Sequence, residues 1–436
     1  MLKIYDLHSA RQTILRRIPA QMSTFPSTIL EDTERIFGTG VTPPQAVAQI
    51  LASIREEGDA ALKRWSQTLD KVQVDEFRIP LGEMAEAYRS LPDSLNQALI
   101  TSANRIRDFH ECQPIPSWET QALGGSLGQR FTPVERIGVY VPGGTAPLPS
   151  SLLMSVIPAQ VAGVRQIVVC TPPNPNPLIL AAAKMCKVNH VYQIGGAQAI
   201  GALAFGTETI PPVDKIVGAG NLFVTLAKQQ VYGIVGLDGL AGPTETMVIA
   251  DADANPQWIA ADLLAQAEHD ILAKAILLTP DCDLARRVQS AVAQQIETLS
   301  RAEIIVQSLA QLGGIVITPD LKTAASIANE YAPEHLCLSV SQPRDLAQEI
   351  YNAGGIFFGE HSFEVLGDYI AGPSHIMPTG GTARFASPLN VLDFVKLTSI
   401  IALDENTTRN LSPVAAQIAR AEMLTAHAAA ADIRGV

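Results

Sequence analysis

The stretch IGVYVPGG, residues 137–144, decides the fold, because it is the first of four short β-branched runs that end in glycine or proline. The other three are QIVVCTPP at 166–173, HVYQIGG at 190–196 and DKIVGAG at 214–220. Each run leads into an apolar, Ala-rich segment, and this alternation is typical of a βαβ series. Strands joined in this way run parallel, and their carboxyl ends share the edge of the sheet where α/β proteins bind ligands.

A second α/β series follows the first one. Its predicted strands are AILLT, GIVIT, HLCLSV and GGIFFG, between residues 275 and 359, and helical segments separate them. Before the first series, apolar residues recur every three or four positions over 43–69 and 81–109, which predicts amphipathic helices. After Val391 the tail is predicted to be helical again. The chain therefore predicts two α/β units in tandem with helical flanks.

The tail helix has recognisable start signals. Ser412 is a candidate N-cap residue, and Pro413 would then occupy the first helical position. The Ala-rich helix is expected to continue to about His427.

Composition limits the kind of protein. The 436 residues are 47% hydrophobic and 17% charged, which is enough apolar material for several packed cores. A net charge of -12 and the absence of basic runs argue against nucleic-acid and anionic-membrane partners. We find no signal peptide or membrane-spanning segment, and the five cysteines form no CxxC pair. We expect a multi-domain cytoplasmic protein with reduced thiols.

A dinucleotide is the first ligand that such a fold suggests. No G-x-G-x-x-G fingerprint follows the strands, since GAGNLF at 218–223 lacks the third glycine. The strand-end loops do carry Tyr140, Gln198 and Asn221. Glycine-rich strand ends also serve as ordinary turns, so the residues alone leave both readings open.

Two short motifs carry candidate catalytic or metal-binding residues. In LLAQAEHD, Gln266 and His269 are three positions apart at a helix end and project from one face, where both could reach a single ion. Such a pair is more often structural. In YAPEHL, Glu334 and His335 begin a strand, where a carboxylate and an imidazole can flank one reacting group. Adjacent Glu-His pairs are also common on surfaces.

The segment Gly367–Phe394 is a long irregular stretch rich in glycine and proline that contains Asp368, His375 and Arg384. A compact domain seldom keeps such a loop without a function, although a simple linker is the alternative. Glu422 and His427 lie in the tail helix and, without further context, would face solvent.

Taken together, these segments resemble the histidinol dehydrogenase family. The resemblance covers nearly the whole chain and rests on VPGGTAP, IGGAQAI, GAGN, DGLAGPTE, LLAQAEHD, YAPEHL, GDYIAGPSHIMPTGGTARF and EMLTAHAAAADIR, in family order. It implies the NAD-dependent, four-electron oxidation of L-histidinol to L-histidine through histidinal, the last two steps of histidine biosynthesis. Two departures are Ala219 in GAGN, where the family has GPGN, and Thr244 in AGPTE, where it has AGPSE. Thr244 keeps the hydroxyl and adds a methyl group, which puts fine substrate preference in doubt.

The resemblance also implies roles for single residues. It makes Glu334 and His335 the acid–base pair and places one zinc ion in each active site. The implied zinc ligands are Gln266, His269, Asp368 and His427. The implied substrate contacts are Thr244, Gln266, His269, His335, Asp368, His375, Glu422 and His427, and the implied NAD contacts are Tyr140, Gln198 and Asn221.

The implied fold is α/β, with two incomplete Rossmann-like domains, one inserted in the other, and small helical N- and C-terminal dimerisation segments. We expect a homodimer with shared active sites. The expected parts are an N-terminal helical segment (1–30), a zinc-binding and catalytic domain (31–136 and 243–390), an inserted NAD-binding domain (137–242) and a tail that reaches the partner's site (391–436).

Three other activities are compatible with parts of this pattern. A family relative could oxidise another small alcohol, such as a sulfopropanediol, with the same zinc and NAD. A zinc hydrolase would use similar ligands and a general-base Glu but no dinucleotide. An aldehyde dehydrogenase of the thiol type would need a nucleophilic cysteine, whereas Cys337 lies in a predicted strand and is expected to be a core thiol.

Overall fold

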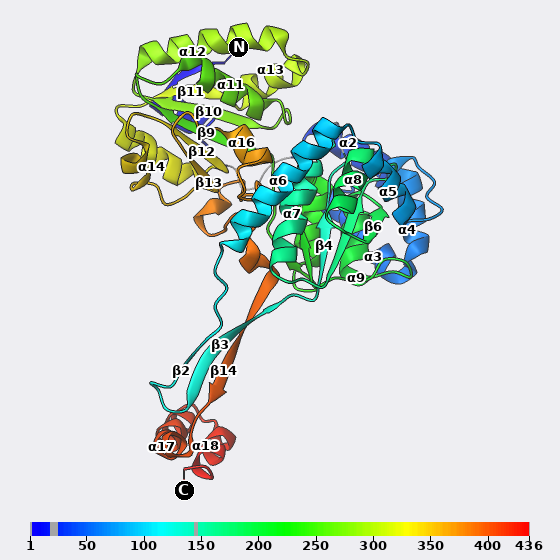
Figure 1. The fold of residues 1–436 in the computed structure, drawn as a ribbon, viewed down its shortest axis with the longest axis vertical. Helices are drawn as coiled ribbons and strands as arrows, with labels where there is room; N and C mark the ends of the chain where they lie inside the picture. Colours follow the sequence, from blue (N-terminus) through cyan, green and yellow to red (C-terminus); the bar gives the residue numbers. More distant parts are fainter. Residues whose placement is uncertain (1, 18–24, 144–146, 436) are drawn as a thin grey trace.

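The protein folds into two lobes and a long arm, seen in a computed structural model that describes residues 2–17, 25–143 and 147–435 (Figure 1). The strands are β1 Ile4–Asp6, β2 Trp118–Thr120, β3 Ser126–Pro133, β4 Arg136–Tyr140, β5 Gln166–Thr171, β6 His190–Gln193, β7 Lys215–Val217, β8 Gly236–Leu237, β9 Glu245–Ala250, β10 Lys274–Thr279, β11 Gly314–Ile317, β12 His335–Ser339, β13 Gly355–Phe358 and β14 Val395–Ala402. The α-helices are α1 Leu7–Gln12, α2 Ser27–Phe37, α3 Pro43–Glu57, α4 Asp59–Trp65, α5 Leu81–Arg89, α6 Asp93–Glu111, α7 Pro149–Val161, α8 Pro177–Met185, α9 Gly196–Phe205, α10 Leu222–Val231, α11 Pro256–Ala267, α12 Cys282–Gln295, α13 Ala302–Gln311, α14 Leu321–Tyr331, α15 Pro343–Ala347, α16 Glu364–Tyr369, α17 Glu405–Ala421 and α18 Thr425–Asp432.

Each lobe is built on one parallel sheet. The five-stranded sheet has the order β6-β5-β4-β7-β8, and the six-stranded sheet has the order β1-β11-β10-β9-β12-β13. Numbered along the chain and leaving β1 aside, both sheets read 3-2-1-4-5, the order of doubly wound α/β folds. The predicted strands of both series are confirmed. The central strand β9 was not predicted.

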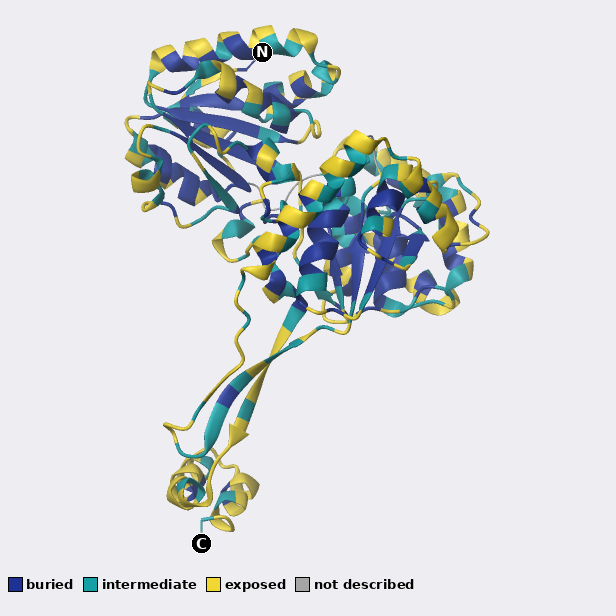
Figure 2. Cartoon of the chain, viewed as in Figure 1, coloured by how far each residue is buried: buried dark blue, intermediate teal, exposed yellow. Residues whose placement is uncertain are grey.

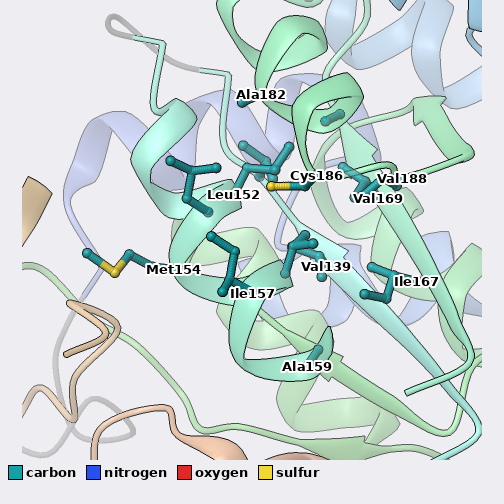
Figure 3. Packing of buried hydrophobic residues seen from close by; sticks show 14 of the residues in the cluster. Val139, Leu152, Met154, Ile157, Ala159, Ile167, Val169, Ala182, Cys186 and Val188 are labelled. Carbon is teal, nitrogen blue, oxygen red and sulfur yellow. The ribbon is translucent and has the colours of Figure 1, made fainter. Parts of the chain in front are cut away.

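Helices cover both faces of each sheet with apolar side chains. In the five-stranded lobe, α5, α6, α7 and α8 pack on one face, where Leu152 and Ile157 meet Val139 and Val169 (Figure 3). Helices α3, α4, α9 and α10 cover the opposite face. In the six-stranded lobe, α11, α12 and α13 cover one face, and α1, α14 and α15 cover the other. Strands buried on both sides explain the near-continuous β-branched runs in the sequence.

The expected grouping of residues 31–136 with residues 243–390 differs from the observed packing. Helices α3, α5 and α6 contact α9, α8 and α7, so they belong to the five-stranded lobe. Leu389, near the end of the second range, also enters the core of that lobe. Residues 1–30 were expected to be helical, but β1 extends the six-stranded sheet by pairing with β11. Helical periodicity shows that a helix has an apolar face, but not which sheet receives it.

The arm consists of β2, β3 and β14, an antiparallel sheet that carries α17 and α18 away from both lobes (Figure 1). The prediction of a helical tail from Val391 is wrong for residues 395–402, which form β14. Helix α17 starts seven residues before Ser412, because the Asp404 side chain caps it by accepting from the Thr407 N–H at 2.8 Å. Pro413 therefore lies inside the helix and not at its first position.

The helices and the cysteines bear on the expectations about membrane spans and reduced thiols. Within residues 2–17, 25–143 and 147–435, none of the helices has the length and apolar character needed to cross a membrane. All five cysteines are free thiols, and three of them are buried.

Candidate active site

The acid–base candidates Glu334 and His335 lie at the amino end of β12, beside the amino end of the neighbouring strand β9 in the six-stranded sheet. His335 begins β12 and pairs in register with Thr246 of β9, so Glu334 lies beside Thr244 and Glu245. This is the edge opposite to the carboxyl ends, where doubly wound sheets usually bind ligands. The predicted neighbourhood of Thr244, Glu334 and His335 is therefore present, but strand polarity alone would have placed it at the other edge.

Glu334 is buried and held by two donors. Its Oε2 atom accepts a hydrogen bond from Thr244 Oγ1 at 2.7 Å and another from the Glu245 N–H at 3.0 Å. Burial raises the pKa of Glu334 to about 7, although the charge of His335 and both hydrogen bonds act in the opposite direction. A carboxyl group that titrates near neutrality is suited to accept and release a proton during a reaction.

His335 has one ring nitrogen fixed and one free. Its Nδ1 lies 3.2 Å from the Glu245 carbonyl oxygen, which can only accept, so Nδ1 carries the proton of that bond. Its Nε2 is buried, lies 3.7 Å from Asp368 Oδ1 and has no hydrogen-bond partner among the described residues. Burial lowers the pKa of His335, but the charges of Glu334, Glu364 and Asp368 outweigh burial and raise it to about 9. The free Nε2 is thus the atom that can act on a ligand.

Gln266 is connected directly to the acid–base pair. It lies in the last turn of α11, is buried, and its amide donates to Thr244 Oγ1, which in turn donates to Glu334. The predicted Thr244 hydroxyl therefore relays a hydrogen bond between a proposed metal ligand and the proposed base. His269 lies just beyond the helix end, and its N–H donates to the Gln266 carbonyl oxygen at 3.3 Å.

Asp368 and His375 lie beside these residues. Asp368 is in helix α16, so the first three residues of the stretch predicted to be irregular are helical, whereas His375 lies in the irregular part that follows. The Asp368 carbonyl oxygen accepts from His375 Nδ1 at 2.7 Å, and His375 Nε2 lies 3.3 Å from Ser151 Oγ of the five-stranded lobe. Burial lowers the pKa of His375, and the charges of Asp368, His335 and His269 also act on it. Asp368, His335 and His269 therefore all lie within electrostatic reach of His375, which contacts Ser151 where the two lobes meet.

The predicted NAD contacts lie at the carboxyl edge of the five-stranded sheet. Tyr140 ends β4, and its buried hydroxyl accepts from the Gly196 N–H at 3.2 Å. Gln198 donates to Asp70 Oδ2 at 3.1 Å, while its buried Oε1 has no partner in the described ranges. Asn221 is exposed and caps α10 by accepting from the Val224 N–H at 3.1 Å. Residues 144–146 of the VPGGTAP motif lie outside the described residues.

Glu422 and His427 are not brought to this site within one chain. Glu422, which follows α17, and His427 of α18 are both exposed. The two helices form the tip of the arm, and most of their surface is exposed (Figure 2). The strand β14 has eight residues, so it alone spans roughly 27 Å at about 3.4 Å per residue. Within the described part of the chain, no group of three His, Cys, Asp or Glu side chains is arranged to hold a metal ion.

Comparisons with known proteins agree on one family. The family model described as histidinol dehydrogenase matches residues 41–435. The chain belongs to the histidinol dehydrogenase family. A relative from Thermus thermophilus, named histidinol dehydrogenase, is 50% identical over 393 residues, covering 90% of this chain and 95% of its own. Another of that name from Moorella thermoacetica is 50% identical over 395 residues, covering 89% and 93%.

A solved structure supports the same family assignment. The crystal structure of histidinol dehydrogenase from Elizabethkingia anophelis superposes with a TM-score of 0.90 at 35% identity. The alignment covers 99% of this chain and 98% of that chain. The similarity in structure therefore includes the arm as well as the two lobes.

Sequence reasoning missed two buried carboxylates next to the site. Glu245 bonds to both catalytic candidates through its backbone, and its side chain forms ion pairs with Arg17 and Lys274. Glu364 accepts from Thr246 and from the Cys337 thiol, so it joins α16 to β9 and β12. For Glu245, the AGPTE motif was a signal in the sequence. For Glu364 there was none, because its role depends on contacts between segments that are distant in sequence.

Proposed function

We propose that the protein oxidises L-histidinol to L-histidine in two steps at the junction of its lobes, with NAD as the hydride acceptor. The observation that carries this proposal is the buried His335 with its free Nε2, set beside Glu334 and Asp368. An alcohol oxidation needs a base for the hydroxyl proton, and the oxidation of the aldehyde needs a base for water. The site offers one group for each task.

In the first step, His335 Nε2 would accept the substrate hydroxyl proton. The Glu245 carbonyl oxygen holds Nδ1–H, which fixes the ring and leaves Nε2 facing the substrate. The raised pKa means that His335 must lose a proton before it can act as a base. Positive charge bound beside Asp368 would favour that loss.

In the second step, Glu334 would take a proton from the water that attacks the aldehyde. Its pKa of about 7 allows it to be ionised at neutral pH and still to hold a proton transiently. Thr244 and the Glu245 N–H keep Oε2 in place during this exchange. NAD, if bound as proposed, would supply the hydride acceptor for both oxidations.

The donor set suits zinc. Gln266, His269 and Asp368 offer an amide oxygen, an imidazole nitrogen and a carboxylate, and His427 of a second chain would be the fourth ligand. Zinc held by such nitrogen and oxygen donors would keep positions for the amine and imidazole of the substrate, and it would then orient the substrate and stabilise developing charge. The buried His335 Nε2, which has no hydrogen-bond partner among the described residues, supports a ligand group bound next to Asp368.

We further propose a homodimer in which the arm of each chain completes the site of the other. Helix α17 exposes Leu411, Val414 and Ile418, whose spacing forms one apolar stripe. Ile401 on β14, in the same arm, is also exposed. Monomeric proteins rarely leave large apolar surfaces in solvent. In an isologous dimer, this face can pack against the same element of a second copy.

The two parallel sheets would be the two incomplete Rossmann-like domains, with NAD on the five-stranded one. This placement is supported by Tyr140, which ends β4, and by Gly218, which follows the adjacent strand β7, at the point where the strand order reverses. The cytoplasm is the proposed location, and the five free thiols fit a reducing compartment.

One assay tests the proposed reaction. Pure zinc-loaded protein is incubated with L-histidinol and excess NAD, and NADH and histidine are measured. We expect two NADH and one histidine for each histidinol consumed. NADH formation with a sulfopropanediol but not with histidinol would identify a different alcohol as the substrate. No NADH with either would favour a hydrolase. A thiol mechanism is disfavoured because the Cys337 thiol is buried, its pKa is raised well above its usual value, and it donates to Glu364.

A further inference from the structure

A buried ion pair contacts the proposed NAD-binding loop, Gly218–Asn221. Lys228 of α10 and Asp238, which follows β8, are joined at 2.5 Å between Nζ and Oδ1. Their side chains are only 2% and 8% exposed. Lysine is seldom fully buried unless it is paired, and burying a charge costs free energy that the pair must offset. Such a pair calls for a structural or functional explanation.

Both groups bind the same loop residue. The Gly218 N–H donates to Asp238 Oδ2 at 2.8 Å, and Lys228 Nζ donates to the Gly218 carbonyl oxygen at 3.0 Å. The ion pair therefore holds the donor and the acceptor of one residue together. Asp238 Oδ1 also accepts from the Gly239 N–H at 2.8 Å, which fixes the carboxylate itself.

Gly218 has a backbone that needs this support. Its φ angle of +107° is rarely adopted by residues with a side chain, and a Cβ atom there would lie 2.2 Å from the Tyr140 carbonyl oxygen. The loop from Gly218 leads directly to Asn221, the N-cap of α10. Since Lys228 lies on the same helix, the pair ties α10, the Gly218 loop and β8 into one unit.

We propose that Lys228 and Asp238 are positioning residues that hold the Gly218–Asn221 loop in the shape that binds NAD. In the usual fingerprint, glycines allow the backbone to approach the dinucleotide and the helix to pack closely. This loop lacks the third glycine, and the buried pair keeps the loop rigid through its hydrogen bonds to Gly218. The inference rests on the proposed NAD site. Neither residue has to touch NAD, because their polar atoms are bound to each other and to the loop.

Three variants separate this role from general stability. Lys228→Met removes the bond to Gly218 and leaves Asp238 without its cation, so both the melting temperature and NAD affinity should fall. Asp238→Asn alone leaves Lys228 unpaired and should behave similarly. The double variant Lys228→Met with Asp238→Asn removes the uncompensated charge. Its melting temperature should recover toward that of the unmodified protein, whereas NAD affinity should stay weakened by about ten-fold, the scale of one lost hydrogen bond.

A matched control comes from the other end of β7. Lys215 pairs with Asp393 at 3.0 Å and is also largely buried, but it begins the strand whose carboxyl end leads to Gly218. Lys215→Met should lower the melting temperature without weakening the binding of NAD. The measurements are the dissociation constant of NAD by calorimetry on the zinc-loaded protein and the KM for NAD and for histidinol. Only the KM for NAD should rise in the Lys228 and double variants.

The outcomes distinguish this inference from the NAD site on which it rests. Asn221→Ala should weaken NAD; if it does not, the assignment of NAD to this loop is wrong. If Asn221→Ala weakens NAD but the double variant binds it normally, the loop binds NAD without help from the pair, and the inference is overturned. NAD affinity that simply follows the melting temperature in every variant, including Lys215→Met, would also overturn it.

Discussion

The guanidinium group of Arg17 forms a two-pronged ion pair with the carboxylate of Glu245, a residue 228 positions further along the chain. Arg17 also lies over the ring of Tyr331 at 3.6 Å and donates to its carbonyl oxygen at 2.6 Å. Because the backbone of Glu245 bonds to Glu334 and His335, this pair connects the first residues of the chain to the proposed acid–base groups.

Arg17→Met should therefore lower turnover by roughly ten-fold, because small displacements of catalytic groups are costly. The KM for NAD should change little, since NAD is assigned to the other lobe. Arg11→Met is the matched control. Arg11 lies in the same N-terminal segment as Arg17 and pairs with Glu330, but both side chains are at least half exposed, and exposed ion pairs contribute little to stability. Equal turnover in the two variants would contradict the role of Arg17.

His269→Ala should lose zinc. Without His269, three of the four proposed ligands remain and zinc is held more weakly, so metal analysis after gel filtration should find well below one equivalent per chain. His361→Ala, which removes a histidine that contacts Trp258 away from the site, should keep its zinc. A full equivalent of zinc in the His269 variant would remove His269 from the ligand set.

Glu334→Gln should damage the second oxidation most. The variant keeps the size of the side chain but cannot take a proton from water, so oxidation of supplied histidinal should fall by about 10²–10⁴-fold. Hydride exchange between histidinol and NAD should fall much less. In the unmodified protein, the rate of histidinal oxidation should rise with pH through about 7 as Glu334 loses its proton, and this rise should disappear in the variant. Equal loss in both half-reactions would refute the division of tasks.

Mixing Asp368→Ala chains with His427→Ala chains should restore activity. Each variant alone should be inactive. Random exchange makes half of the dimers mixed, and each mixed dimer has one intact site out of two, so about a quarter of the activity should return. A mixture of Glu422→Ala with His427→Ala should recover nothing, because every site then receives a defective arm. No recovery in the first mixture, with exchange demonstrated, would mean that His427 acts elsewhere.

His110 should make stability sensitive to acid. It is fully buried, its Nδ1 donates to the Ile106 carbonyl oxygen at 2.7 Å, and burial lowers its pKa. The unfolded chain therefore takes up this proton at a higher pH than the folded chain. The free energy of unfolding should fall as pH drops below about 6.5, by at most about 1.4 kcal/mol per pH unit from this group. Urea unfolding of His110→Gln should show a smaller fall, whereas a change at the exposed His8 should not alter it.

The sequence was most informative where strands are buried on both faces. The runs that became β4, β5, β6 and β7 are rich in β-branched residues because helices cover them on both sides. Strand β14 stands in solvent with most of its side chains exposed, so it has no alternating pattern to detect. The wrong prediction of a helix over residues 395–402 follows from this.

Only those residues of the candidate site that lie in short sequence motifs could be predicted. Glu334 and His335 are adjacent, so one motif contains both, and the family resemblance supplied their roles. Glu364 and Lys228 have no such signal. Their importance comes from bonds to segments that are distant in sequence, and single-sequence patterns do not encode these contacts.

In the proposed dimer, each catalytic centre is made from residues of two molecules. With exchanged arms, a separated chain has neither His427 nor Glu422 at its own site, however well its lobes are folded. At concentrations below the dissociation constant of the dimer, the number of complete centres rises with the square of the protein concentration. The reaction rate then depends on the square of the enzyme concentration, so dilution lowers the activity per chain.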